Sequence, residues 1–424
     1  MFRHPSRPRK NWRQKVEEQG LTYAVDRAET GDERPYWHEA AVYEVSEEEV
    51  EYLEEVTEEL HGMALKAAHR MVDDPGTMAR LGLPPEATEL MRDSLLDPGI
   101  TLYGRFDLAY DGTGPAKLLE YNADTPTGLV EAAVIQWYWL EDEMPDFDQW
   151  NLLHERLVQA WTKAAPHIPD GVVHFAVGAN EPNEDWATVA YLRDTAREAG
   201  LVDFGITMEE IGWHHARRIF VDTWGREIST CFKLYPWEWM LNETFGRYIL
   251  DGSSSTTWIE PVWKALLGSK ALLVMLWEMY THHENLLPAY FDGPRDLGSR
   301  YVVKPMFGWE GAGVRIHEAD GALVAARPER HAAGQECVYQ QFVDLPRFPG
   351  GNYAVLGTWM VGGHAAGLGI RESDHLVTDT DARFVPHFLN APRSTPEQVA
   401  AWLAGDAGEA QRISEQSAKG GYQS

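Results

Sequence analysis

The chain has 424 residues, of which 44% are hydrophobic and 24% charged, and this composition is typical of a folded, water-soluble protein with two or three domains or one large multilobed enzyme. Its 37 basic and 66 acidic residues give a net charge of −29, which disfavours binding to nucleic acid and favours cationic ligands such as polyamines. No apolar run approaches the roughly 18 residues of a membrane helix, and the two cysteines are too few for a disulfide framework, so we expect a cytoplasmic protein that does not bind membranes.

Three regions follow one another along the chain. Residues 1–34 are rich in arginine and lysine and lack the apolar segment of a secretory signal, so we interpret them as a basic, solvated arm that leads into the fold. Residues 35–390 mix segments typical of strands with segments typical of helices, which predicts a mixed α/β fold. Residues 391–424 are dominated by small and polar residues, and we expect a peripheral, partly mobile tail there.

A long amphipathic helix is predicted near the start of the main region. Ser46 precedes Glu49 by three residues, which is the spacing of a capping box, and apolar residues then recur at helical intervals from Val50 to Met71. The turn-forming sequence Asp-Asp-Pro-Gly follows directly and should end the helix. The expected helix therefore covers about residues 47–72.

The most informative segment, residues 105–122, reads as a strand, a glycine-containing loop and a second strand, which together predict a β-hairpin. Side-chain alternation and the loop length place Asp107 opposite Glu120 and Arg105 opposite Asn122 on one face. Two facing carboxylates repel unless a cation lies between them, and Asp, Glu and Asn oxygens suit Mg²⁺. We therefore predict a magnesium site on this face, with Arg105 placed to meet an anionic substrate oxygen. The alternative is a solvated surface hairpin in which Arg105 neutralises Asp107.

A hydroxyl-bearing turn follows the hairpin. Thr125, Pro126 and Thr127 precede an apolar helix that should begin near Pro126 or Thr127. The exposed amides of a helix N-terminus, with two hydroxyl groups beside them, can bind a carboxylate or a phosphate. Alternatively, the threonines only cap the helix.

Two lysines and a glycine-rich turn are candidate phosphate-binding elements. Lys304 ends an apolar strand and leads into a turn with Gly308, Gly311 and Gly313, where backbone N–H groups can approach phosphates closely. The spacing matches neither a Walker loop nor the dinucleotide fingerprint. Lys270 opens an apolar helix, where a cation is unfavourable unless an anion binds beside it. Either lysine could instead be a solvated cation whose stem packs on apolar neighbours.

Late in the chain, a glycine-containing strand leads to Arg371. Glycines within a strand suggest that another group approaches the backbone closely. Arg371 could stabilise a transferring phosphoryl group. The alternative is a surface arginine paired with Glu372.

Taken together and in order, several segments resemble the glutathionylspermidine synthase family, whose synthetase half is an ATP-grasp ligase. The segments are R-F-D (105–107), L-E-Y-N-A-D-T-P-T (119–127), E-A-A-V-I-Q-W-Y-W-L-E-D (131–142), W-I-E-P-V-W-K-A-L-L-G-S-K (258–270), V-V-K-P-M-F-G-W-E-G-A-G-V (302–314) and Y-Q-Q-F (339–342). The resemblance covers about residues 35–390 and implies a multilobed ATP-grasp fold with mixed and antiparallel sheets flanked by helices. It also implies that Mg²⁺ and ATP convert a carboxylate to an acyl phosphate, which an amine attacks to give an amide.

The resemblance implies roles for residues at matching positions. The implied magnesium ligands are Asp107, Glu120 and Asn122, the nucleotide-binding residues are Lys270, Lys304, Gly308, Gly311 and Gly313, the contacts to the reacting groups are Arg105 and Arg371, and the positions that hold a peptide-like substrate are Thr125 and Thr127. On this hypothesis Glu184 or Asp185 orients a cationic amine or accepts its proton, unless both lie in a solvated loop.

The predicted function is therefore an ATP-dependent acid–amine ligase whose substrates are a peptide-like carboxylate and an amine or polyamine. The chain has no room for the amidase domain of bifunctional members, so we expect synthesis only, as in standalone bacterial acid–amine ligases. One alternative is a non-catalytic nucleotide-binding or scaffold protein that keeps the fold. Another is a glycoside hydrolase, suggested by abundant tryptophan and paired acids. The sequence does not identify the acid, the amine or the oligomeric state.

Overall fold

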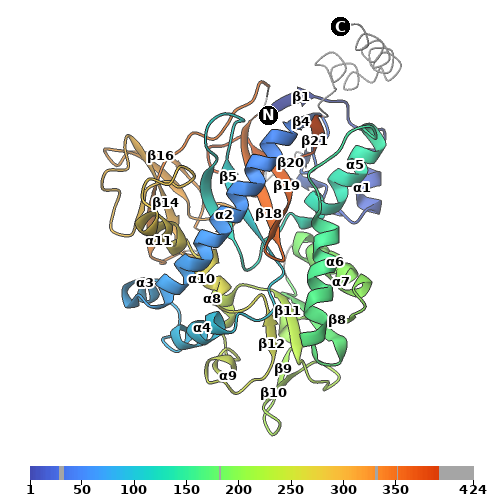
Figure 1. Cartoon of the computed structure of the whole chain (residues 1–424), viewed down its shortest axis with the longest axis vertical. Helices are drawn as coiled ribbons and strands as arrows, with labels where there is room; N and C mark the ends of the chain where they lie inside the picture. Colours follow the sequence, from blue (N-terminus) through green and yellow to red (C-terminus); the bar gives the residue numbers. More distant parts are fainter. Residues whose placement is uncertain (28–32, 181–182, 330–332, 351, 391–424) are drawn as a thin grey trace, which may run out of the picture.

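The computed structural model describes residues 1–27, 33–180, 183–329, 333–350 and 352–390, so the predicted tail at 391–424 lies outside the described residues. Helices and strands are interspersed along the described chain, and this confirms the predicted mixed α/β class. Figure 1 shows the long helix α2 (Glu47–Val72) crossing the molecule in front of the central strands.

The central sheet is antiparallel and contains the predicted hairpin. Its strands, in spatial order, are β20 (Arg383–Val385), β19 (His364–Ser373), β18 (Tyr353–Val361), β5 (Tyr103–Ala109) and β6 (Lys117–Asn122). Side chains of β5 alternate between two environments, because Phe106 and Leu108 belong to the apolar core that includes α2, whereas Arg105 and Asp107 line a pocket. One strand thus anchors the core and presents polar groups to the pocket.

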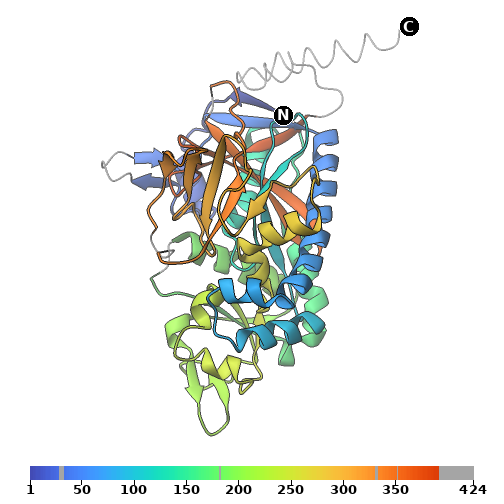
Figure 2. The ribbon, with the colours of Figure 1, turned by 90° about the vertical axis from the view of Figure 1, so that its left-hand side faces the viewer.

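A second antiparallel sheet lies beside the central one and supplies the predicted lysine strand (Figure 2). Its strands, in spatial order, are β13 (Ala289–Tyr290), β17 (Cys337–Gln341), β14 (Arg300–Pro305), β15 (Arg315–Glu318) and β16 (Leu323–Ala326). Lys304 lies on β14, the middle strand.

The remaining strands form smaller sheets. A parallel sheet contains β12 (Thr257–Ile259), β11 (Thr230–Leu234), β7 (Val172–Val177) and β8 (Val202–Thr207). A mixed sheet contains β1 (Phe2–Pro5), β4 (Ala41–Ser46) and β21 (His387–Asn390), and two strand pairs are β2 (Val25–Arg27) with β3 (Glu33–Pro35) and β9 (Gly212–His214) with β10 (Ile219–Val221).

Helices cover these sheets, and α2 packs against β18, β19 and two apolar helices, α10 and α11. Besides α2, the α-helices are α1 (Trp12–Glu18), α3 (Pro75–Arg80), α4 (Ala87–Leu96), α5 (Gln136–Glu143), α6 (Leu153–Ala164), α7 (Asn183–Glu198), α8 (Trp237–Met240), α9 (Arg247–Leu250), α10 (Lys264–Gly268) and α11 (Ala271–Met279). A π-helical turn, η1 (Glu131–Ile135), precedes α5, and short 3₁₀ turns are η2 (Ala165–His167), η3 (Pro169–Gly171) and η4 (Met208–Glu210). Within the described part of the chain, no helix is long and apolar enough to cross a membrane.

The first 27 residues differ from the predicted solvated arm. They form β1, which pairs with β4, and the helix α1. Arg9 is buried and pairs with buried Glu39 at 2.7 Å, and Arg3 pairs with buried Glu372 at 2.5 Å. Arg9 and Arg3 therefore belong to the fold, because a buried cation requires a buried anion, whereas Arg7, Lys10 and Arg13 are exposed.

Helix α2 begins as predicted and offers a direct stability test. The Ser46 side chain accepts a hydrogen bond from the backbone N–H of Glu49, and the Glu49 side chain returns to the backbone of Ser46. Ser46→Ala is expected to lower the free energy of unfolding by about 1 kcal/mol, because the backbone N–H of Glu49 loses its acceptor. Urea unfolding should show an earlier midpoint, whereas Ser94→Ala, inside α4, should not; equal midpoints for wild type and Ser46→Ala would contradict the capping role.

Candidate functional site

The predicted hairpin register is confirmed. Asp107 on β5 lies opposite Glu120 on β6, and Arg105 lies opposite Asn122. The Asn122 amide nitrogen is 3.1 Å from a Glu120 oxygen and 3.4 Å from an Asp107 oxygen, so the three predicted metal ligands share one small region. A bulge between Asp107 and Leu108 shifts the pairing only from Leu108 toward the loop. The polar positions before it therefore keep the predicted register.

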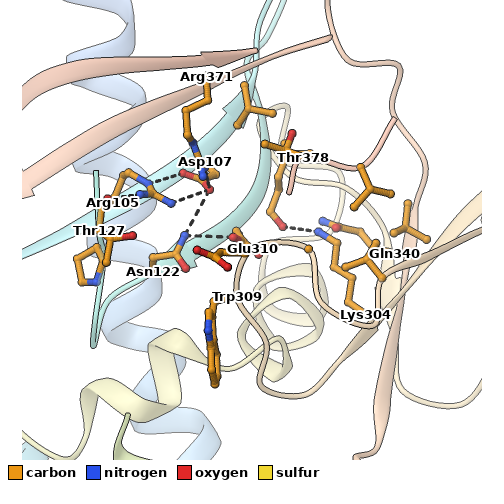
Figure 3. Close-up of a pocket in the computed structure, with 18 of the residues that line it drawn as sticks. Arg105, Asp107, Asn122, Thr127, Lys304, Trp309, Glu310, Gln340, Arg371 and Thr378 are labelled. Atoms are coloured by element: carbon orange, nitrogen blue, oxygen red, sulfur yellow. Dashed lines mark hydrogen bonds and ion pairs between the residues drawn. The ribbon is translucent and has the colours of Figure 1, made fainter. Parts of the chain in front are cut away.

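Cationic side chains from three parts of the fold surround the two carboxylates. The Asp107 carboxylate accepts hydrogen bonds from Arg105 Nε at 2.7 Å and from Arg371 Nη2 at 2.6 Å. Glu120 pairs with Lys270 Nζ at 3.0 Å. Figure 3 shows the guanidinium groups of Arg105 and Arg371 converging on Asp107. The facing carboxylates therefore do not need a metal ion to offset their repulsion, because Arg105, Arg371 and Lys270 already do so.

The charge balance keeps Glu120 ionised. Burial alone would raise the pKa of Glu120, but Lys270 and Lys304 outweigh it and hold the pKa well below its usual range. Lys304 is buried, and burial lowers its pKa to about 8 even though Glu120 favours the charged form. Because two cations lie beside one carboxylate, this region can bind an additional anion.

The polar face lines a pocket of about 220 Å³ between the central sheet and the second antiparallel sheet. The predicted site residues that line it are Arg105, Asp107, Glu120, Asn122, Thr125, Thr127, Asp185, Lys304, Gly311 and Arg371. Apolar side chains from both sheets, including Val302, Ile316 and Val355, form another part of its wall. The pocket therefore combines a charged end with an apolar slot.

Four predicted residues, Lys270, Glu184, Gly308 and Gly313, are outside this lining. Lys270 nevertheless belongs to the charge cluster, because its ammonium contacts Glu120 and donates to the carbonyl of Gly308 at 3.0 Å. Glu184 lies in the first turn of α7 beside the lining residue Asp185.

The conformation of the glycine turn depends on a close contact with another part of the chain. Gly311 has a φ of 69°, and a Cβ atom there would lie 2.6 Å from the Thr378 carbonyl oxygen. The close approach at Gly311 is therefore to the backbone near Thr378, which also lines the pocket.

Arg371 does not pair with its neighbour Glu372, so the surface alternative for this arginine is wrong. The two side chains leave β19 on opposite faces, as the alternation of a strand requires. Arg371 meets Asp107, whereas Glu372 is buried and accepts hydrogen bonds from Arg3 and Tyr43. The site thus gains Arg371 from a strand more than 200 residues beyond Asp107.

The helix after the threonine turn begins later than predicted. Its first helical residue is Leu129, preceded by Gly128 with a φ of 79°, so neither threonine occupies the N-cap. Arg105 donates a hydrogen bond to the carbonyl of Thr127, which ties the turn to the charged face. The two threonines are therefore part of the pocket wall rather than caps.

A buried ion pair holds the residue that directly precedes this turn. Asp124, directly before Thr125, accepts from Lys233 Nζ at 2.7 Å and from the backbone N–H of Trp237 at 2.9 Å. Lys233 is fully buried on β11. No role could be assigned to Lys233 from the sequence, because its partner Asp124 lies 109 residues away and no local pattern links the two.

Other pocket residues were not predicted as site residues from the sequence. Trp239 and Trp309 contact each other edge to face with ring centroids 5.0 Å apart, and both line the pocket with Glu310. Gln340, on β17, lies near Lys304 in Figure 3. Trp309, Glu310 and Gln340 fall within the quoted motifs, which was the available signal.

The residues present fit a magnesium ion. Carboxylate and amide oxygens are hard donors that suit Mg²⁺. In this structure the Asn122 Nδ2 group donates to both Asp107 and Glu120, so the amide would have to rotate to present its oxygen to a metal ion. Among the described residues, no group of three or more His, Cys, Asp or Glu side chains is arranged to hold a metal. An ion at the hairpin would therefore need the Asn122 amide or bound phosphate oxygens to complete its shell.

Comparisons with known proteins cover most of the chain. The family described as "Glutathionylspermidine synthase preATP-grasp" matches residues 3–390. A protein of Haemophilus influenzae, provisionally named an acid–amine ligase, is 38% identical over 369 residues, which are 85% of this chain and 92% of that one. The trypanothione synthetase of Crithidia fasciculata and the bifunctional glutathionylspermidine synthetase/amidase of Escherichia coli are each 26% identical.

The coverage of these relatives is unequal. The matches take in 77% and 81% of this chain but only 53% and 58% of the Crithidia and Escherichia proteins, so the chain spans little more than half of their length. A solved structure from Methylobacillus flagellatus, of a protein provisionally named a gamma-glutamylcysteine synthetase, aligns with 84% of this chain and 97% of its own at 16% identity and a TM-score of 0.45.

Proposed function

Because the chain belongs to the glutathionylspermidine synthase family, we propose that it is an ATP- and Mg²⁺-dependent ligase of the ATP-grasp class that joins a carboxylate to an amine. One observation carries the proposal: carboxylates, lysines and arginines from the central sheet, the second sheet and α11's N-terminal edge meet around one pocket. Such an arrangement suits phosphoryl transfer, in which catalysis depends mainly on positioning and charge stabilisation.

The nucleotide would lie between the two antiparallel sheets. Lys304 and Lys270 would contact its phosphates, which are the anions that this cationic cluster can accept. Apolar residues of the slot, such as Val302 and Ile316, would contact the base. The turn with Gly308, Gly311 and Gly313 would close over the phosphates from the second sheet.

The magnesium ion would be held by Asp107, Glu120 and Asn122. When bound, it would neutralise phosphate charge and fix the phosphates for in-line transfer. Arg105 and Arg371 would then exchange part of their contact with Asp107 for contact with substrate oxygens, because both guanidinium groups already lie at that carboxylate.

The acid would lie at the threonine turn. Its carboxylate would be oriented by Arg105, with Thr125 and Thr127 hydroxyls contacting the rest of the molecule. Transfer of the terminal phosphoryl group of ATP to this carboxylate gives an acyl phosphate and ADP; attack by the amine nitrogen then forms the amide bond and releases phosphate. Arg371 would stabilise charge on the transferring group, and Asp185 or Glu184 would accept the proton that the amine loses.

The site argues against glycoside hydrolysis. A glycosidase needs one carboxyl group whose pKa is raised so that it can act as an acid. The neighbouring lysines instead hold the pKa of Glu120 below its usual range, and Asp107 is bound by two arginines. Glu120 therefore lacks the protonation that the acid role requires.

The test is ADP release measured against a matrix of acids and amines. With Mg²⁺ and ATP, release is expected only when a suitable acid and amine are both present; glutathione and glycylglycine are the first acids, and spermidine, 1,4-diaminobutane and hydroxylamine the first amines. Mass spectrometry should detect the amide or hydroxamate product. If calorimetry shows ATP binding while no pair supports ADP release above background, the non-catalytic alternative is favoured.

A further inference from the structure

A buried ion pair in the segment W-I-E-P-V-W-K (258–264) lies outside the proposed chemistry. Glu260 and Lys264 are almost fully buried, and their charged groups are 2.6 Å apart. Neither residue lines the pocket. Apolar side chains of similar size often stabilise a core equally well, so the distinctive contribution of a buried ion pair is the geometry of the groups that it binds.

The pair binds the backbone at the start of β5, the strand that carries Arg105. One Glu260 oxygen, Oε1, accepts hydrogen bonds from the backbone N–H groups of Leu102 at 2.9 Å and Tyr103 at 3.1 Å. Lys264 Nζ donates to the carbonyl of Tyr103 at 2.6 Å. Both backbone polar groups of Tyr103 are therefore hydrogen-bonded to the ion pair.

At this point the ion pair takes the place of a neighbouring strand. Pairing of β5 with β6 ends where Arg105 lies opposite Asn122, because the chain then leaves the sheet for the threonine turn. Tyr103 lies opposite Val361 on β18, but β6 does not extend to it. Buried backbone groups require hydrogen-bond partners, and the ion pair supplies them here.

Tyr103 contacts two parts of the proposed acid site, one directly and one through Trp359. Its hydroxyl donates to the carbonyl of Pro126, in the threonine turn, at 3.3 Å. Its ring stacks on that of Trp359 with centroids 6.1 Å apart, and the Arg105 guanidinium lies 5.7 Å from the centroid of the same Trp359 ring. A shift of Tyr103 would therefore move groups that are proposed to orient the acid.

Two further contacts connect the same segment to the site. Trp237 Nε1 donates to the carbonyl of Glu260 at 3.0 Å, and the backbone N–H of Trp237 donates to Asp124, which directly precedes the threonine turn. Lys264 begins α10, which leads to Lys270 of the charge cluster. The segment that holds the start of β5 thus also contacts the residue that holds Asp124 and supplies a lysine of the site.

We propose that Glu260 and Lys264 are positioning residues: they set the place of Arg105 relative to the threonine turn, and thereby align the substrate carboxylate with the phosphoryl group to be transferred. The proposal rests on the proposed ligase function and extends it to the assembly of the acid site. Loss of the pair should impair use of the acid more than nucleotide binding, because Val302 and Ile316 of the nucleotide slot lie on the second sheet.

The test removes both charges together in the full chain. Glu260→Gln with Lys264→Met leaves neither charge buried without its partner, and glutamine can still accept from the two backbone N–H groups. With an acid and an amine that support ADP release, kcat/KM for the acid is expected to fall roughly 100-fold, a loss that a misplacement of about 1 Å can cause. Affinity for a non-hydrolysable ATP analogue, measured by calorimetry, should stay within about threefold of wild type.

A second buried ion pair provides the matched control. Glu39→Gln with Arg9→Met also removes one acidic and one basic charge, from a pair that lies outside the pocket lining. Urea unfolding establishes that each double variant is folded at the assay temperature. The control should keep kcat/KM for the acid within about threefold of wild type. An equal loss in both double variants, or an unchanged kcat/KM in Glu260→Gln/Lys264→Met, would overturn the positioning role.

Hydrogen exchange followed by mass spectrometry separates this proposal from the ligase function. Peptides covering residues 123–128 should exchange faster in Glu260→Gln/Lys264→Met than in wild type, whereas peptides covering residues 300–305 on the second sheet should not. If wild type releases no ADP with any acid and amine, the ligase proposal fails, and this exchange difference decides whether the pair positions the threonine turn. Unchanged exchange at residues 123–128 would show that it does not.

If the double variant does not fold, Tyr103→Phe replaces it. This change removes only the hydroxyl that donates to Pro126. It should raise KM for the acid roughly fivefold, the effect expected from losing one neutral hydrogen bond, and leave the affinity for the ATP analogue unchanged. An unchanged KM for the acid would refute the proposed connection between the start of β5 and the acid site.

Discussion

Asp107→Asn is expected to lower the rate of substrate-dependent ADP release by roughly 1,000-fold or more. Under the proposed function, Asp107 holds the magnesium ion, and loss of its charge would remove several kcal/mol of transition-state stabilisation. Asparagine keeps the size of the side chain, so the loss would report charge and not shape. The measurement is the initial rate at saturating ATP across a range of Mg²⁺ concentrations.

The same substitution tests how the charge cluster is balanced. Asp107 accepts hydrogen bonds from Arg105 and Arg371, so its neutralisation leaves two guanidinium groups facing each other without a shared anion. Asp111→Asn, in the exposed loop of the same hairpin, is the matched control and should retain nearly full activity. Activity of Asp107→Asn within a few fold of wild type would remove the metal site from the proposed mechanism.

Local sequence patterns predicted the parts of the site that lie on neighbouring strands. The alternation of Arg105 and Asp107, together with the loop length, was sufficient to set Glu120 and Asn122 opposite them. The capping box at Ser46 likewise located the start of α2. Both depend on interactions between residues that are close in sequence, which is why single-chain patterns reveal them.

Partners that meet through tertiary packing were not predictable in the same way. Arg371 reaches Asp107 from β19, and Lys270 reaches Glu120 from the N-cap of α11. Their positions depend on how the two antiparallel sheets and α11 pack, and no local spacing encodes that. The prediction that a metal ion must separate the carboxylates overlooked these cations for this reason.

The contacts of the N-terminal segment were likewise not predictable from local sequence patterns. Its arginines resemble a solvated basic arm when only composition is considered, yet Arg9 and Arg3 each have a buried acidic partner. Tyr23, in the same segment, donates a hydrogen bond to buried Glu131. A charge count cannot distinguish a solvated cation from one that is paired inside the fold.

Lys233→Met is expected to lower the free energy of unfolding by about 3–5 kcal/mol, which is the usual cost of leaving one member of a buried ion pair without its partner. Lys233 is fully buried and donates to Asp124 and to the carbonyl of Tyr235, while Asp124 also accepts from the backbone of Trp237. Methionine fills a similar volume, so the loss should come from the unpaired Asp124 carboxylate and not from a cavity.

A double-mutant cycle isolates that charge. Asp124→Asn in the Lys233→Met background should recover much of the lost stability, because asparagine can still accept from Trp237 without a buried charge. Lys163→Met, exposed on α6, should leave the urea midpoint nearly unchanged. If the double variant is no more stable than Lys233→Met, the pair does not carry the proposed electrostatic role. Recovery of stability without recovery of acid-dependent ADP release would show that the Lys233–Asp124 contact also positions the threonine turn, because Asp124 directly precedes Thr125.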